Sequence, residues 1–219
     1  MTKFDIRVAI DNLPYLLQGL VVTLKISFFA LLLALAIGVL VALVRVWRYF
    51  PAQAAARVYV DFIRGTPALV QIFFVYYGLP LVGLNLTAPV AGILALAVNS
   101  GAFISEMIRG AILAVDPGQM EAGRALGMSY GRTMLRIILP QTVRPVIPPL
   151  TGEFITVIKG SSLLSVISIG ELTRAGQQVI GSTFRPFEIY AVVALLYLVV
   201  CATLTQLTRH GELWAARRV

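Results

Sequence analysis

Long runs of apolar residues, each close to the length that crosses a lipid bilayer, dominate the sequence. Segments 26–44 and 189–208 contain no charged residue, and the charge-free stretch 65–105 is too long for one span. Turn-forming Gly and Pro residues interrupt that stretch between 78 and 89, so we divide it into two spans of roughly 20 residues. With a further apolar region that contains Glu153 and Lys159, the pattern predicts five membrane-spanning helices, near 15–44, 62–82, 89–112, 144–168 and 187–208.

The composition supports a protein that faces lipid. Of the 219 residues, 58% are hydrophobic and only 13% are charged, and the mean hydropathy is +0.87. A soluble domain usually carries about a quarter charged residues. So few charges cannot cover the water-exposed surface of a protein of this size. We therefore expect an all-α, polytopic membrane helical bundle in which residues 1–219 form a single domain.

The placement of basic residues predicts the orientation of the bundle. The net charge is +8, which in a soluble protein could indicate a nucleic acid partner, but the basic residues gather in alternate connections. Cytoplasmic loops collect Lys and Arg, so we expect the N-terminus outside, the C-terminus in the cytoplasm, and no nucleic acid partner. The predicted cytoplasmic side holds Arg45, Arg48, Arg57, Arg64, Arg109, Arg124, Arg132, Arg136, Arg144, Arg209, Arg217 and Arg218, and the other side holds Lys3, Arg7, Arg174 and Arg185.

The segment 116–141 is too polar to span a membrane and too regularly patterned for an irregular loop. Asp116 followed by Pro117 is typical of a helix start, and Gly127 suits a helix end. Ser129 can cap a second short helix that ends before Pro140. The pattern predicts a cytoplasmic helix-turn-helix with a docking surface for another protein. Its apolar residues are Met120, Ala122, Ala125, Leu126 and Met128.

This segment resembles the cytoplasmic signature of bacterial ABC-importer permeases: Glu-Ala-Ala, three residues, Gly, nine residues, Ile, one residue, Leu-Pro. The chain departs from it only at Gly123, where Ala is usual, and this Gly should loosen the helix by roughly 1 kcal/mol. The resemblance implies a type I ABC-importer permease fold and a coupling helix that inserts into a cleft of an ATP-binding subunit. It assigns that coupling role to Glu121, Ala122, Gly123, Gly127, Ile137, Leu139 and Pro140.

Other motifs along the whole chain are similar to the polar amino acid branch of these permeases, among them Arg64–Gln71, Asn99–Phe103 and Lys159–Leu163. The resemblance implies a subunit of the bacterial inner membrane that translocates a polar amino acid by alternating access. The implied partners are ATP-binding-cassette ATPase subunits, a second permease copy or homologous permease, and a periplasmic or surface solute-binding protein. ATP would be bound by the partner, so no cofactor is expected on this chain.

Polar side chains inside the predicted spans are candidates for the substrate pathway, because such groups are costly in lipid. Glu153 could accept the ammonium group of an amino acid. Alternatively, these groups bond other helices or backbone freed by prolines. Glu153 and Lys159 are six residues apart and are not expected to pair, and Pro145, Pro148 and Pro149 predict an interrupted helix around them. The further candidates are Asn99, Gln71, Thr23, Ser27 and Lys159.

The sequence contains no phosphate-binding loop, nucleophile elbow or zinc-protease motif. The only histidine, His210, has no ligand neighbours at metal-binding spacing. We therefore expect no enzymatic activity and no metal site. Two function classes remain, a subunit of an ATP-driven importer and a self-sufficient channel or ion-coupled carrier. Carriers often contain inverted repeats, and none is visible, which favours the importer.

Overall fold

The computed structural model describes residues 5–47 and 50–216; residues 1–4, 48–49 and 217–219, Lys3 among them, lie outside that description. The described chain is helical, with four helical runs long and apolar enough to span a membrane and a fifth if one bent pair is counted. The expected all-α bundle of about five spans is confirmed. Its main helices are α1 (Ile6–Asp11), α2 (Leu13–Val46), α3 (Phe50–Gly65), α4 (Ala68–Phe73), α5 (Ala88–Leu113), α6 (Pro117–Ala125), α7 (Tyr130–Thr133), α8 (Leu139–Gly160), α9 (Leu172–Thr183) and α10 (Pro186–Ala216).

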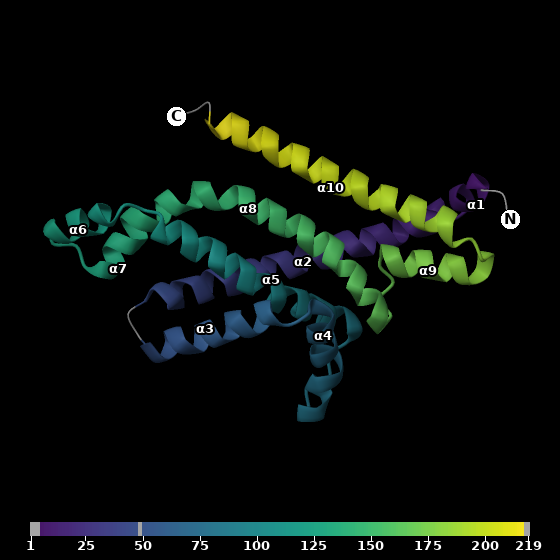
Figure 1. Ribbon diagram of the computed structural model, residues 1–219, viewed down its shortest axis with the longest axis horizontal. Helices are drawn as coiled ribbons and strands as arrows, with labels where there is room; N and C mark the ends of the chain where they lie inside the picture. Colours follow the sequence, from purple (N-terminus) through teal and green to yellow (C-terminus); the bar gives the residue numbers. More distant parts are fainter. Residues whose placement is uncertain (1–4, 48–49, 217–219) are drawn as a thin grey trace.

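The long helices run side by side along one axis (Figure 1). α2 packs along α5, α8 contacts both of these helices, and so does α3. α10 packs against α8 and α9. α6 and α7 lie at one end of the molecule, here called the coupling end, and α1 and α9 lie at the opposite end (Figure 1).

Small residues let α2 and α5 approach each other closely. The buried face of α2 carries Ala30, Ala34, Gly38 and Ala42, and it meets a stretch of α5 around Gly101 that is equally poor in bulky side chains. Small residues drive helix association in lipid because they permit close van der Waals contact where no hydrophobic effect operates. This interface holds together the two helices around which the bundle is arranged.

The second predicted span is bent. α3 ends at Gly65, and α4 begins after Pro67, whose backbone is extended. The helix axis bends by 112° between α3 and the part that begins with α4. The second part continues from α4 through a π-helical turn (Phe74–Gly78) and a 3-10 turn (Leu79–Val82), and it projects sideways from the bundle (Figure 1). The expected span near 62–82 therefore contains a break that its Gly-Thr-Pro sequence explains.

The helix after the coupling segment is longer than the sequence indicated. The second short helix does not end before Pro140, because α7 passes through a π-helical turn (Met134–Ile138) directly into α8. The region expected near 144–168 lies inside a helical run from Tyr130 to Ile167. Wider π turns are a common accommodation within helices, and this one lies directly before the proline.

The prediction that prolines interrupt the helix around Glu153 is wrong. Pro145, Pro148 and Pro149 lie inside α8, which stays α-helical to Gly160 and then tightens into a 3-10 turn (Ser161–Ile167). Side chains in this stretch donate to its backbone carbonyls, as Thr142 Oγ1 does to Leu139 O at 2.7 Å. Packing against the neighbouring helices α5 and α10 makes these prolines tolerable inside a membrane helix.

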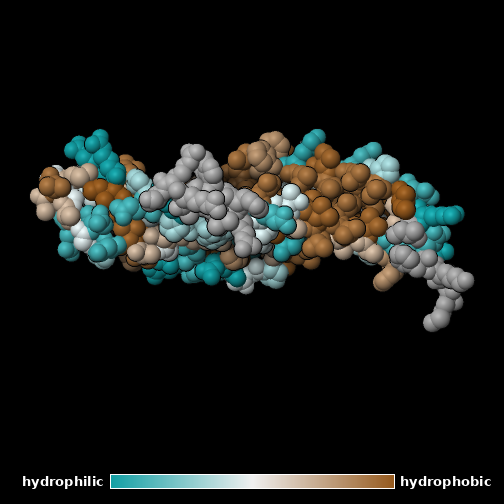
Figure 2. Space-filling model, turned by 90° about the horizontal axis from the view of Figure 1, so that it is seen from above, coloured by the Kyte–Doolittle hydropathy of each residue, from teal (hydrophilic) through white to brown (hydrophobic). Residues whose placement is uncertain are grey.

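The outer surface matches a protein surrounded by lipid. Exposed large apolar side chains run along α2 and α10, among them Phe28, Phe29, Leu195 and Leu198. Figure 2 shows an apolar surface right of centre on the face seen from above, with polar side chains gathered towards both ends. A water-exposed monomer rarely carries apolar surface on this scale.

Candidate functional site

The coupling segment begins with a capped helix, as expected. Asp116 caps α6 by accepting a hydrogen bond from the Gly118 N–H at 2.8 Å, and Pro117 occupies the first turn. Ser129 caps α7 by accepting from the Arg132 N–H at 3.4 Å. Both caps satisfy backbone N–H groups that a helix start leaves without intrahelical partners.

The turn between α6 and α7 is a left-handed glycine turn. Gly127 has a φ of +79°. Its N–H donates to Arg124 O at 2.9 Å, and the next N–H, of Met128, donates to Gly123 O at 3.1 Å. This pair of bonds is the Schellman arrangement, in which glycine ends a helix without steric cost. The turn fixes how the exposed tip of the coupling segment is presented.

The predicted coupling residues divide between an outer and an inner face. Glu121, Ala122, Gly127 and Pro140 are exposed, whereas Gly123 is buried and Ile137 and Leu139 are partly buried. The inner residues hold the segment against the bundle, and the outer ones lie where another protein can reach them. Of the five apolar residues expected on the docking surface, Ala122, Ala125 and Leu126 are exposed, Leu126 at 82%.

One carboxylate at the coupling end gathers arginines from three helices. Glu106 on α5 forms ion pairs with Arg45 at the end of α2, with Arg109 one turn further along α5, and with Arg64 at the end of α3. The Arg109 contact is 3.0 Å long and that of Arg64 is 3.8 Å. The positions of these arginines in the sequence predict only the orientation of the bundle, and the spacing of three between Glu106 and Arg109 is the one local sign of the cluster.

Two of the predicted pathway residues hold the bend between α3 and α4. Gln71 is buried, and its Nε2 donates to Ile63 O at 2.8 Å and to Thr66 O and Oγ1 at 3.1 and 2.9 Å. Asn99 Nδ2 donates to Gln71 Oε1 at 2.9 Å. The structure brings these candidates together and gives Gln71 the backbone carbonyls that the broken helix leaves free.

Glu153 is buried between α8 and α5, with 6% of its surface exposed. Ser100, which the sequence analysis did not select, donates a hydrogen bond to it. Among the residues that the structure describes, no basic side chain forms an ion pair with Glu153. Because Ser100 follows Asn99 in α5, Glu153 and the Gln71–Asn99 pair lie around the same turn of that helix.

Thr23 and Ser27 are fully buried on α2, and Ser27 Oγ has no hydrogen-bond partner among the described residues. Thr23 Oγ1 accepts a hydrogen bond from the Leu172 N–H at 3.1 Å, at the start of α9. Thr23 therefore joins α2 to α9 near the opposite end of the molecule, as the alternative structural interpretation expects.

A second buried carboxylate, Glu171, organises that junction. It caps α9 by accepting from the N–H groups of Thr173 at 2.9 Å and Arg174 at 2.7 Å. Tyr197 on α10 donates to it at 2.9 Å. Burial raises the pKa of the Glu171 carboxyl, and these hydrogen bonds oppose that shift. Its local role is structural, since each partner belongs to the packing of α9.

Lys159 lies on a different face of α8 from Glu153. It is exposed and lines a groove of about 710 Å³ together with Thr173, Tyr197 and Cys201. The structure therefore does not bring Lys159 to Glu153, and the two do not pair among the described ion pairs. The predicted pathway residues on α4, α5 and α8 therefore form two neighbouring pairs, Gln71 with Asn99 and Glu153 with Ser100.

Known proteins resemble the chain over nearly its full length. Residues 34–212 match the family of binding-protein-dependent transport system inner membrane components. The glutamine transport system permease protein of Escherichia coli K12 is 39% identical over 212 residues, 96% of this chain and 97% of that protein. The arginine transport system permease protein of Bacillus subtilis 168 is 36% identical over 211 residues, 96% of each chain.

Solved structures agree with this likeness. An amino acid ABC transporter crystallised with histidines is 38% identical, with a TM-score of 0.90 over 100% of both chains. An inward-facing methionine ABC transporter, 21% identical, shares the fold with a TM-score of 0.76 over 92% of this chain and 96% of its own. These findings favour a permease subunit of an ABC importer over a self-sufficient carrier. The chain belongs to the family of inner membrane components of binding-protein-dependent transport systems.

Proposed function

We propose that this permease translocates a polar amino acid and that Glu153 receives the ammonium group of that substrate. The observation that carries the proposal is a buried carboxylate that no described ion pair neutralises, with Ser100 as its hydrogen-bond donor. A charge inside the membrane is costly unless a partner of opposite sign meets it, and an amino acid supplies one. Permeases for glutamine and arginine among the relatives support this substrate class.

Asn99 is the second candidate contact for the substrate. It is partly exposed and has its amide held by Gln71. Its own carbonyl oxygen is an acceptor, as Glu153 is, so this corner of the bundle favours a ligand rich in N–H donors. The α-ammonium group of an amino acid fits that requirement. Lys159 and Thr23 lie elsewhere and are not part of this proposed contact.

The coupling segment would link substrate translocation to ATP hydrolysis in a partner subunit. A partner ATPase would dock on the exposed face that contains Glu121, Ala122 and Leu126. Because α7 continues into α8, a displacement of the segment moves the same helical run that carries Glu153. Closure of an ATPase pair around ATP would thus rock the bundle between inward- and outward-facing states, with a second permease, identical or homologous, completing the pathway.

The proposed orientation places the coupling end in the cytoplasm, the N-terminus and α9 outside, and a solute-binding protein at that outer end. Exposed Gln119 on α6 and exposed Ser182 on α9 allow a direct test. In a Cys201→Ser background, Gln119→Cys should react with a membrane-impermeant thiol reagent only after the membrane is opened. Ser182→Cys should react in intact cells, and the reverse pattern contradicts the orientation.

Uptake into proteoliposomes tests the role of Glu153. Glu153→Gln should raise the KM for the transported amino acid by about ten-fold or more, because a charge-assisted hydrogen bond is worth about 1.5–3 kcal/mol. Glu171→Gln is the matched control, since it removes an equally buried carboxylate outside the Glu153–Ser100 pair. It should lower thermal stability and leave KM unchanged. Unchanged uptake and selectivity in Glu153→Gln would contradict the proposal.

The coupling face has a separate test. Glu121→Ala and Leu126→Asp change exposed positions and should leave the fold intact. In the assembled transporter they should abolish the stimulation of ATP hydrolysis by loaded solute-binding protein. Ser182→Ala, at the opposite end of the molecule, serves as the control. Normal stimulation and normal transport in both coupling variants would exclude this face as the ATPase contact.

A further inference from the structure

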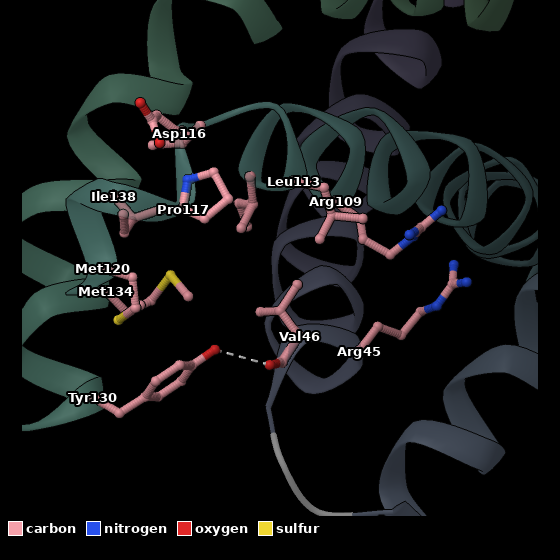
Figure 3. A pocket seen from close by; sticks show the side chains of 12 residues that line it. Arg45, Val46, Arg109, Leu113, Asp116, Pro117, Met120, Tyr130, Met134 and Ile138 are labelled. Carbon is pink, nitrogen blue, oxygen red and sulfur yellow. Dashed lines mark hydrogen bonds between the residues drawn. The ribbon is translucent and has the colours of Figure 1, made fainter.

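We propose that the permease carries a binding site for an anionic phospholipid at its coupling end. A pocket of about 380 Å³ lies between the ends of α2 and α5 and the coupling segment. Its position follows from how the segment packs: Tyr130 O–H donates to Val46 O at 3.1 Å and holds the segment across the end of α2 (Figure 3). The pocket is separate from the Glu153–Ser100 pair and plays no part in the proposed substrate contacts.

The pocket has an apolar side and a basic side. Figure 3 shows Met120, Met134, Tyr130 and Ile138 on one side and the guanidinium groups of Arg45 and Arg109 together on the other, with Leu113 between them. A ligand that spans this space needs an acidic head and an apolar body. Methionines adapt their shape to such a body, because their side chains are unbranched and flexible.

The basic side of the pocket carries more positive than negative charge in its ion-pair cluster. Three guanidinium groups, those of Arg45, Arg64 and Arg109, share the single Glu106 carboxylate. Each guanidinium has several N–H donors, more than one carboxylate can accept from all three. A phosphate group brings further acceptor oxygens and offsets the excess charge.

The pocket's own carboxylate, Asp116, does not compete for these arginines. It lies on the far side of the pocket in Figure 3 and caps α6 through the Gly118 N–H. The negative group nearest to the guanidiniums is therefore Glu106, which they outnumber. A ligand that is acidic and rich in hydrogen-bond acceptors therefore complements the charge of this pocket.

The membrane supplies a ligand of this kind. The arginines lie at the ends of spanning helices, at the level where headgroups meet water, and basic pockets between helices on the cytoplasmic side bind anionic headgroups. One acyl chain would lie against Leu113, Met120 and Met134 while the phosphate meets Arg45 and Arg109. The site touches the coupling segment, so an occupied pocket would brace that segment against α2 and α5. This placement rests on the proposed orientation of the coupling end.

Native mass spectrometry of the full-length permease tests the site. Protein purified with its accompanying subunits is exchanged into detergent that contains phosphatidylglycerol or, for comparison, phosphatidylcholine. Wild type should retain phosphatidylglycerol in preference. Arg109→Gln should retain about five-fold less, because one basic residue near a membrane surface contributes about that factor. Arg136→Gln removes an exposed charge of the same segment that does not line the pocket, and retention should stay at the wild-type level.

A second variant tests the contact with the acyl chain separately from the contact with the headgroup. Leu113→Trp fills the middle of the pocket without a change of charge, and Leu113 is 65% exposed, so the fold should tolerate it. Retention of phosphatidylglycerol should fall in this variant too. Equal retention in wild type, Arg109→Gln and Leu113→Trp overturns the proposal. So does a loss in Arg136→Gln as large as in Arg109→Gln, or a loss confined to Arg109→Gln. Lipid retention is measured without transport, so the proposed function can fail independently.

Discussion

Gly123 packs so closely against Thr133 that an alanine methyl group does not fit between them. A Cβ at position 123 would lie 2.5 Å from Thr133 Cγ2, 2.9 Å from its Oγ1 and 3.3 Å from Ile137 Cδ1. The residue that departs from the permease signature is therefore the one at which α6 touches the following helix. Its glycine serves a packing contact, in addition to any loosening of the helix.

Gly123→Ala should lower the stability of the permease by about 1–3 kcal/mol, because an overfilled contact forces the two helices apart. Adding Thr133→Ala removes both of the closest atoms and should restore part of that loss. Melting temperatures of the two single variants and the double variant form the test. If the double variant loses as much as the two single variants combined, the contact does not constrain position 123.

Gly127→Ala should cost about 1 kcal/mol, since the φ of +79° is unfavourable for any residue with a Cβ. The space around it is open, so the cost comes from the backbone alone. Gly181 in α9 is the control, because it lacks both a positive φ and a close neighbour. Gly181→Ala should be neutral or stabilising. Equal thermal stability of the two variants would contradict the backbone argument.

Gly38→Ala should separate α2 from α5. The added Cβ would lie 2.5 Å from Ile104 Cγ2, so we expect a loss of about 1–3 kcal/mol and less folded protein in the membrane. Gly110→Ala, in α5, meets no atom within 4 Å and tests the general effect of an added methyl group. A fluorescence-detected size-exclusion profile after heating compares the two. The prediction fails if both variants lose the same amount.

Gln71 and Asn99 should differ in what their removal changes. Gln71→Leu strips hydrogen bonds from the carbonyls of Ile63 and Thr66 at the bend, at a cost of about 1–3 kcal/mol in stability. Uptake by the protein that still folds should show a smaller rise in KM than Asn99→Ala, because Asn99 stays in place and loses only its contact with Gln71. Asn99→Ala should instead raise KM with a smaller loss of stability. Uptake kinetics and melting temperatures separate the two roles, and a KM in Gln71→Leu that rises more than in Asn99→Ala would contradict them.

The stability that depends on Glu171 should fall as the pH rises. Burial raises the folded-state pKa of this carboxyl above its ordinary value of 4.5, so the folded protein favours the protonated form. The contribution is fully present below the unfolded-state pKa and is lost as the pH rises through the folded-state pKa. The melting temperature of wild type relative to Glu171→Gln should decrease over this window. A difference independent of pH would show that burial does not perturb Glu171.

The sequence alone predicted the features that depend on local pattern. Apolar runs of bilayer length predicted about five spans, because lipid accepts only helices with long apolar faces. Asp116, Ser129 and Gly127 predicted the caps and the turn of the coupling segment, since each acts on backbone groups a few residues away. The expected interruption failed because neighbouring helices decide: α8 stays α-helical through its three prolines where it packs against α5 and α10.

The partners of the polar groups were set only by the tertiary structure. Glu106 meets Arg45 and Arg64 from two other helices, and Thr23 meets the start of α9, contacts between residues far apart in the chain. No spacing along the sequence distinguishes Thr23, which joins two helices, from Glu153, which lies buried without an ion pair. The sequence determined that the chain crosses a membrane and ends its coupling helix at Gly127. The packing of helices decided which buried polar groups are already satisfied: Thr23 and Gln71 have partners, whereas Ser27 Oγ has none among the described residues and Glu153 has no described ion pair. Of these, only Glu153 carries a carboxylate that could meet the ammonium group of a substrate.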